Sequence, residues 1–96
     1  MDRPGTLRKG EAAFSCAVHD LSRHGVLVAA DVAVSIGDRL QLDLELASGM
    51  PVRCVIQVKH AEPGRFGAAI VSISPEDEGN IFRFLEQLTE LNLLGF

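Results

Sequence analysis

The sequence predicts a small antiparallel β-barrel followed by a C-terminal amphipathic α-helix. Three observations predict this fold class. Short β-prone segments follow one another with turn residues between them, residues 40–46 alternate between apolar and polar, and the last quarter changes to helical spacing. Short strands joined by hairpins are typical of antiparallel barrels and sandwiches. The 96 residues are expected to form a single domain over 1–96, since two half-sized cores would bury too little apolar surface.

Residues 1–10 are expected to form a flexible basic arm outside the barrel. Pro4, Gly5 and Gly10 interrupt a segment that has three cations and no apolar periodicity. Glycine and proline punctuate regular structure, and chain ends are commonly mobile. The barrel is therefore predicted to span residues 12–73.

Five strands are predicted within residues 12–73. The clearest one covers residues 40–46, where a period of two places four leucines on one face and the polar residues on the other. On a helix the same spacing would scatter the leucines around the axis. The other four predicted strands are residues 12–18, 26–28, 52–59 and 66–73, which turn residues separate at 20–25, 35–38, 48–49 and 62–65.

A helix is predicted over residues 75–94. Ser74 supplies an N-cap, Pro75 suits the first helical position, and Asp77 is placed to reach back to the cap. Apolar residues then recur at helical spacing and form a stripe that can cover the barrel. The stripe consists of Ile81, Phe82, Phe84, Leu85, Leu88 and Leu91.

The end of this helix is more apolar than a small barrel needs. We interpret residues 81–88 as core. Leu91, Leu93, Leu94 and Phe96 extend the apolar character further. Since exposed apolar surface often marks an interaction site, we expect a protein partner or a second copy of the chain to contact this end.

Composition excludes several classes of function. The net charge is −4 and the chain lacks Trp and Tyr, so a nucleic-acid polymer is not an expected partner. The longest apolar run, residues 26–30, is too short to cross a membrane, and no signal peptide is evident. We therefore expect a cytoplasmic domain, in which Cys16 and Cys54 are reduced, buried thiols.

The most informative segment is Asp20-Leu21-Ser22-Arg23-His24-Gly25, which lies between two predicted strands. It resembles the Asp/Asn-x-Ser-x-x-Gly motif of the PilZ domain family. The resemblance extends over residues 12–88, through a Gly-Asp-x-Leu turn at residues 37–40, a Phe-Gly-Ala strand start at Phe66 and the terminal helix. It implies a small β-barrel that binds the bacterial second messenger cyclic di-GMP.

The resemblance also implies roles for three residues of the turn. Asp20 can accept hydrogen bonds from the N1–H and N2–H₂ edge of guanine, because a carboxylate is an acceptor-only group. Ser22 can hydrogen-bond a base or a phosphate, and Gly25 lets a bulky ligand approach the backbone closely. An Asp-x-Ser turn can equally cap itself by hydrogen bonds to its own backbone, so both interpretations stay open.

The upstream half of the family's nucleotide site is not matched. PilZ domains that bind the nucleotide carry Arg-x-x-x-Arg, separated from the Asp-x-Ser turn by an additional strand. Here Arg3 and Arg8 are five positions apart, and the separating strand is expected to be missing or much shortened. On a mobile arm, Arg3 and Arg8 are the candidates to substitute, because guanidinium groups bind phosphates and stack on bases.

Other chemistry is poorly supported. Cys16, His19 and His24 are metal-binding residue types, but the paired spacing of zinc sites is missing. Asp20, Ser22 and His24 lie within one turn, whereas the members of a catalytic triad come from separate elements. We therefore expect no enzyme, no metal and no cofactor.

These observations lead to two functional hypotheses. In the first, the chain is a non-catalytic module of bacterial cyclic di-GMP signalling, in which ligand at Asp20, Ser22 and Gly25 orders the arm with Arg3 and Arg8 and changes a partner-facing surface. In the alternative, the module has lost the nucleotide and is an adaptor that acts only by protein–protein contact.

Overall fold

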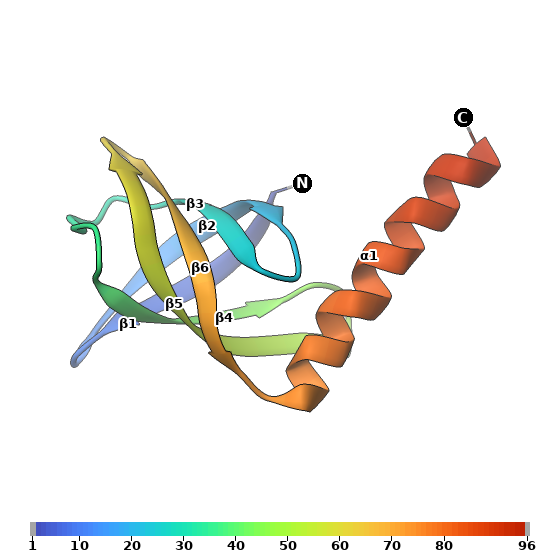
Figure 1. Cartoon of the computed structure of the whole chain (residues 1–96), viewed down its shortest axis with the longest axis horizontal. Coiled ribbons are helices and arrows are strands. Elements are labelled where there is room, and N and C mark those ends of the chain that lie inside the picture. Colours follow the sequence, from blue (N-terminus) through green and yellow to red (C-terminus); the bar gives the residue numbers. More distant parts are fainter. Residues whose placement is uncertain (1, 96) are drawn as a thin grey trace.

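A closed six-stranded antiparallel barrel is followed by one helix, which confirms the predicted fold class (Figure 1). The computed structural model describes residues 2–95, with side chains described up to residue 88. The elements are β1 (Arg3–Lys9), β2 (Ala12–Leu21), β3 (Gly25–Ala29), β4 (Arg39–Glu45), β5 (Pro51–Glu62), β6 (Arg65–Ile73) and α1 (Pro75–Gly95).

The order of the strands around the barrel is β1-β2-β3-β6-β5-β4, and β4 pairs with β1 to close it. The other pairs are hairpins of consecutive strands, except that β3 pairs with β6 and not with β4. In this ring β1 and β6 are three positions apart in either direction, so they lie on opposite sides of the barrel. The outward-facing side chains of β1 and β6 therefore point away from each other.

The interior of the barrel is filled by the alternate residues that the sequence pattern selects. The leucines of residues 40–46 are buried, while Gln41 and Asp43 between them are part-exposed. The matching apolar residues of β5 also point inward. The fully buried side chains are Leu7, Val18, Val28, Leu40, Leu42, Leu46, Val52, Ile56, Val58, Phe66 and Ile81.

The prediction of a flexible arm over residues 1–10 is wrong, because Arg3–Lys9 is strand β1. β1 pairs along its whole length with β2, and from Gly5 to Arg8 also with β4. Leu7, which is 0% exposed, is the single large apolar residue that β1 contributes to the core, so the segment shows no periodicity. Pro4 is tolerated because it precedes the part of β1 that pairs with β4.

β1 also accounts for the short spacing between Arg8 and the Asp20 turn. Arg3 and Arg8 lie within β1 itself, so no additional strand separates them from β2, which leads into the turn. Gly5 has a packing reason of its own, because a Cβ at this position would lie 3.0 Å from the carbonyl oxygen of Asp43 and 3.3 Å from Sγ of Cys16. A side chain at this position would therefore require the neighbouring atoms of β4 and β2 to shift by a few tenths of an ångström.

Helix α1 begins as predicted at a Ser74 cap, whose hydroxyl accepts a hydrogen bond of 3.1 Å from the Asp77 N–H. The Asp77 carboxylate does not reach back to the cap, however. It accepts a hydrogen bond of 3.2 Å from the backbone N–H of Arg53. Arg53 precedes the part of β5 that pairs with β6, so its N–H needs another acceptor. Asp77 therefore ties the start of the helix to β5.

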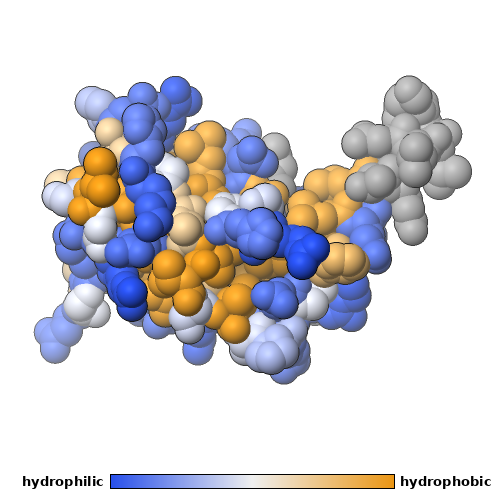
Figure 2. Space-filling view, in the orientation of Figure 1, coloured by the Kyte–Doolittle hydropathy of each residue, from blue (hydrophilic) through white to orange (hydrophobic). Residues whose placement is uncertain are grey.

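Only the first half of α1 covers the barrel, and the rest projects away from it (Figure 1). Ile81 and Phe84 are 1% and 4% exposed, which confirms their assignment to the core. For Phe82 and Leu88 the interpretation as core is wrong, because they are 45% and 37% exposed. Figure 2 shows apolar surface along this part of the helix. The predicted interface at Leu91, Leu93, Leu94 and Phe96 lies outside the residues whose side chains are described. Within residues 2–95, no helix is long and apolar enough to cross a membrane.

Candidate functional site

The turn between β2 and β3 is held by its own side chains. Oγ of Ser22 accepts hydrogen bonds from the N–H groups of Gly25 and His24, at 3.1 and 3.3 Å. The Ser22 N–H donates to the Gly25 carbonyl at 2.9 Å, and Oδ1 of Asp20 accepts the Leu21 N–H at 2.9 Å. Ser22 therefore fixes the shape of the turn, which is the self-capping that its residue types allow.

Gly25 has a structural role that needs no ligand. A Cβ at this position would lie 2.9 Å from the carbonyl oxygen of Ala68, on the neighbouring strand β6. Real Cβ atoms essentially never approach so closely, so a larger residue would push β3 and β6 apart. Glycine at the start of β3 is therefore required by the packing of the two strands.

An irregularity in β2 turns Asp20 toward the outside of the barrel. The pairing of β2 with β3 shifts between Val18 and Asp20, which leaves His19 as the extra residue of a β-bulge. Bulges re-aim the side chains that follow them. After the bulge Asp20 is exposed and Leu21 is buried.

A second bulge lies on β5, at the same level of the barrel. The pairing of β5 with β6 shifts between Val58 and His60, so Lys59 is the extra residue. Side chains 52, 54, 56 and 58 are buried, and both Lys59 and His60 are then exposed. Without the bulge, strict alternation would turn His60 into the core.

The two bulges lie at the ends of one row of residues across four strands. Asp20 on β2 pairs with Leu27 on β3, Leu27 with Gly67 on β6, and Gly67 with His60 on β5. Three strand spacings make this row roughly 14 Å long. Nothing lies within 4 Å of the place where a Gly67 Cβ would be, so the middle of the row is open.

A recess of about 470 Å³ follows this row on the outside of the barrel. Asp20, Ser22 and His24 line one end and Lys59 and His60 the other, with small and apolar residues between them. The lining is completed by Gly25, Val26, Leu27, Gly67, Ala68 and Ala69. The recess therefore joins an acidic end to a basic end over an apolar floor.

In a comparison with known protein families, the model of the PilZ domain matches residues 1–87. The chain belongs to the PilZ domain family. No curated protein sequence matches the chain. PilZ domains are non-catalytic binding modules, and membership implies a role in cyclic di-GMP signalling. The matched residues include β1, which agrees with the finding that β1 is a strand of the barrel.

The PilZ barrel brings together three of the five predicted ligand-binding residues. Asp20, Ser22 and Gly25 all line the recess, whereas Arg3 and Arg8 do not. Arg8 faces outward from β1 and forms an ion pair of 3.4 Å with Asp43. The Arg3 guanidinium lies 5.4 Å from the centre of the Phe84 ring of α1, within reach of a cation–π interaction. Since β1 is opposite β6, Arg8 lies on the far side of the barrel from the recess.

Lys59 and His60 are the site residues that the sequence analysis missed. The sequence contains one feature that could have indicated that both side chains are exposed. Residues 52–58 alternate between apolar and polar, apart from Val55, but Lys59 and His60 are two polar residues in succession. Such a break is typical of a bulge, although it does not indicate which strand lies opposite.

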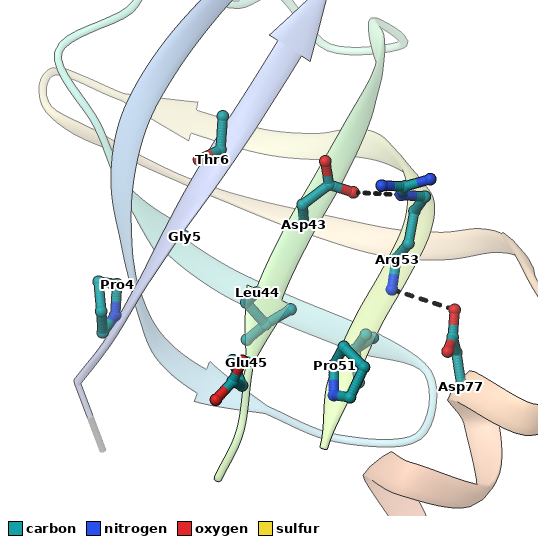
Figure 3. A pocket seen from close by; sticks show the side chains of 10 residues that line it. Pro4, Gly5, Thr6, Asp43, Leu44, Glu45, Pro51, Arg53 and Asp77 are labelled. Atoms are coloured by element: carbon teal, nitrogen blue, oxygen red, sulfur yellow. Dashed lines mark hydrogen bonds and ion pairs between the residues drawn. The ribbon is translucent and has the colours of Figure 1, made fainter. Parts of the chain in front are cut away.

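A larger recess, of about 620 Å³, lies between β1, β4, β5 and the start of α1 (Figure 3). Three of its four charged residues, Asp43, Arg53 and Asp77, are already bonded to one another, and Glu45 is the fourth. Asp43 binds Arg53 at 3.0 Å as well as Arg8, and Asp77 accepts the Arg53 N–H. Burial opposes ionisation of Asp43, but hydrogen bonds from Gln41, Arg53 and Arg8 outweigh it and lower its pKa. Because these groups satisfy each other, the recess beside Asp20 is the better candidate site.

The described residues contain no group of three His, Cys, Asp or Glu side chains that could hold a metal ion. Cys16 and Cys54 are both buried free thiols. Burial raises the pKa of Cys54 to about 11 and also raises that of Cys16. Both side chains therefore stay protonated near neutral pH, where a metal would need the thiolate.

Proposed function

We propose that this PilZ domain binds cyclic di-GMP in the recess beside the Asp20 turn, as a non-catalytic sensor in the cytoplasm of a bacterium. One observation carries the proposal. Three residues of the family motif, Asp20, Ser22 and Gly25, line a single recess whose middle is left open by Gly67. The recess is long enough for a guanine at one end and a phosphate at the other.

Asp20 is the residue that recognises guanine. Its Oδ1 accepts the Leu21 N–H, and within the described residues Oδ2 has no hydrogen-bond partner. A carboxylate oxygen has more than one lone pair, so Asp20 can accept from both N–H groups of a guanine edge. Ser22 holds the turn in shape, and Gly25 leaves room beside it. The apolar floor at Leu27 offers contact to the face of the base.

Asp20→Ala is expected to weaken binding of cyclic di-GMP by roughly ten- to a hundredfold, because a hydrogen bond to a charged group contributes about 1.5–3 kcal/mol. Titration calorimetry of the purified domain measures this. Asp31→Ala is the matched control, since Asp31 is exposed in a loop that does not line the recess. Equal affinity of the Asp20 and Asp31 variants would place the nucleotide elsewhere.

One observation favours the adaptor hypothesis. Both arginines that were candidates to replace the family's Arg-x-x-x-Arg already have partners, Arg3 at Phe84 and Arg8 at Asp43. If the folded domain shows no heat of binding at high micromolar cyclic di-GMP, the adaptor hypothesis replaces the sensor. Arg8→Ala tests whether Arg8 belongs to the nucleotide site. A loss of affinity like that of Asp20→Ala would require Arg8 to leave Asp43 and reach the ligand, whereas unchanged affinity would place Arg8 outside the site.

A further inference from the structure

We propose that Lys59 and His60 on β5 bind a phosphate group of the nucleotide, at the end of the recess opposite Asp20. The assignment rests on the proposed function and deepens it, because it supplies the cations that Arg3 and Arg8 do not bring to the site. It concerns two residues outside the Asp-x-Ser turn, on a different part of the chain.

Geometry places both side chains at the recess. The β5 bulge leaves Lys59 as the extra residue and exposes both Lys59 and His60. Both line the same recess as Asp20 and Ser22. His60 also ends the row that begins at Asp20, so the two groups are separated by three strand spacings, or roughly 14 Å. A ligand that spans the row meets an acceptor at one end and donors at the other.

Among the described residues, the Lys59 ammonium at this end has no carboxylate partner. Nζ of Lys59 donates to the neutral amide oxygen of Gln57 at 3.5 Å, a long hydrogen bond that a ligand can replace. Glu62, the carboxylate whose pKa is influenced by His60, is bound by Arg65, and that hydrogen bond is the main cause of its lowered pKa. Lys9 differs, because its ammonium is held at 3.1 Å by Asp38.

The residue types suit a phosphate. Lysine offers three N–H donors on a flexible stem, and histidine adds a ring N–H donor. Backbone groups of the open position Gly67 lie between this pair and the guanine end. An anion can therefore approach Lys59 and His60 over position 67 without meeting a side chain there.

The first experiment measures cyclic di-GMP binding to the wild-type domain and to Lys59→Ala, His60→Gln and the double variant, by titration calorimetry at several salt concentrations. We expect each single change to weaken binding about tenfold, because each removes a donor to a charged acceptor. We also expect the double variant to have a weaker salt dependence, since salt screens exposed charges. Lys9→Ala is the matched control and should bind like the wild type.

The outcomes distinguish this assignment from the proposed function. If Asp20→Ala weakens binding while Lys59→Ala and His60→Gln do not, the phosphate assignment is wrong and the proposed function stands. If the wild type does not bind cyclic di-GMP, the proposed function fails, and titration with inorganic pyrophosphate followed by amide NMR decides the assignment. Shifts at Lys59, His60 and Gly67 that the double variant abolishes support an anion site there, and their absence overturns it.

Discussion

Single inserted residues decide which side chains the recess of this PilZ domain presents. The bulge at His19 turns Asp20 outward, and the bulge at Lys59 turns His60 outward. The bulge at His19 also returns Leu21 to the core, and after the bulge at Lys59 the partly buried Ala61 packs against the core. Removing either extra residue would therefore exchange a recess residue for a core residue, so the site and the packing depend on the same insertions.

The residues of the site that lie close together in the sequence could be predicted, and those brought together by strand pairing could not. Asp20, Ser22 and Gly25 belong to one turn, and the hydrogen bonds of the Asp20 and Ser22 side chains run over at most three positions, so a short sequence motif identifies them. Lys59 and His60 join them only through the pairing of β3 with β6 and of β6 with β5. A short sequence pattern does not show which strands pair or in which register. For the same reason the sequence made Arg8 a candidate, although Arg8 lies on the opposite side of the barrel from the recess.

Cys54 gives a prediction for the pH dependence of stability. The thiol is 3% exposed, and burial, together with the charges of Asp43 and Asp77, raises its pKa to about 11. Between about pH 9 and 11 the unfolded chain loses the Cys54 proton while the folded chain keeps it. Titration of Cys54 therefore leaves the free energy of unfolding almost unchanged below about pH 9 and lowers it as the pH rises from about 9 to 11. The loss from Cys54 is up to about 3 kcal/mol over the whole window, and about 2 kcal/mol of it falls between pH 8 and pH 10.5, where urea unfolding can measure it.

The control for this prediction is Cys54→Ala. The variant has a smaller side chain in the core and should be less stable at pH 8. Its free energy of unfolding should nevertheless fall less between pH 8 and pH 10.5 than that of the wild type, because the thiol no longer titrates. Parallel curves for the two proteins would show that Cys54 ionises alike in the folded and unfolded states.

At the scale of elements, the strands from β2 to β6 and the helix could be predicted, and β1 could not. The alternation of residues 40–46 fixes β4 from local pattern alone. β1 offers Arg3, Gly5 and Leu7 on its inner side, and only Leu7 is a large apolar residue. Its strand conformation comes from pairing with β2 and β4, which is tertiary context that propensity does not contain.

Helix α1 should depend on Phe84 for its attachment to the barrel. Phe84 is 4% exposed, and its ring also receives the Arg3 guanidinium. Near it, Nδ2 of the buried Asn80 donates to the Pro51 carbonyl at 2.9 Å. Phe84→Ala is therefore expected to lower the free energy of unfolding by about 3–5 kcal/mol, as measured by urea denaturation.

Phe82→Ala is the matched control for Phe84, because Phe82 is the same residue type on the same helix but 45% exposed. We expect this change to cost less than about 1 kcal/mol. Similar losses for the two variants would mean that the helix does not gain its stability from the contact with the barrel.

At the scale of the whole molecule, the turn of the recess touches the helix that projects from the barrel. The Arg23 guanidinium, between Ser22 and His24, lies 5.4 Å from the centre of the Phe82 ring. Through its carbonyl, His24 also accepts the N–H of Ile70 on β6 at 2.8 Å. Because residues 3–9 already form strand β1, a ligand cannot act on a distant surface by ordering them as a flexible arm. The contact of Arg23 with Phe82 can instead transmit a movement of the turn to helix α1.

Arg23→Ala should separate nucleotide binding from its effect on α1. Arg23 does not line the recess, so the variant should bind cyclic di-GMP with wild-type affinity in calorimetry. In the wild type, a ligand that moves the turn should shift the amide NMR signals of residues 79–85, because Arg23 contacts the helix there. The variant should lose these shifts while those of residues 20–25 remain. Equal shifts at residues 79–85 in both proteins would show that the helix responds by another path or through the barrel itself.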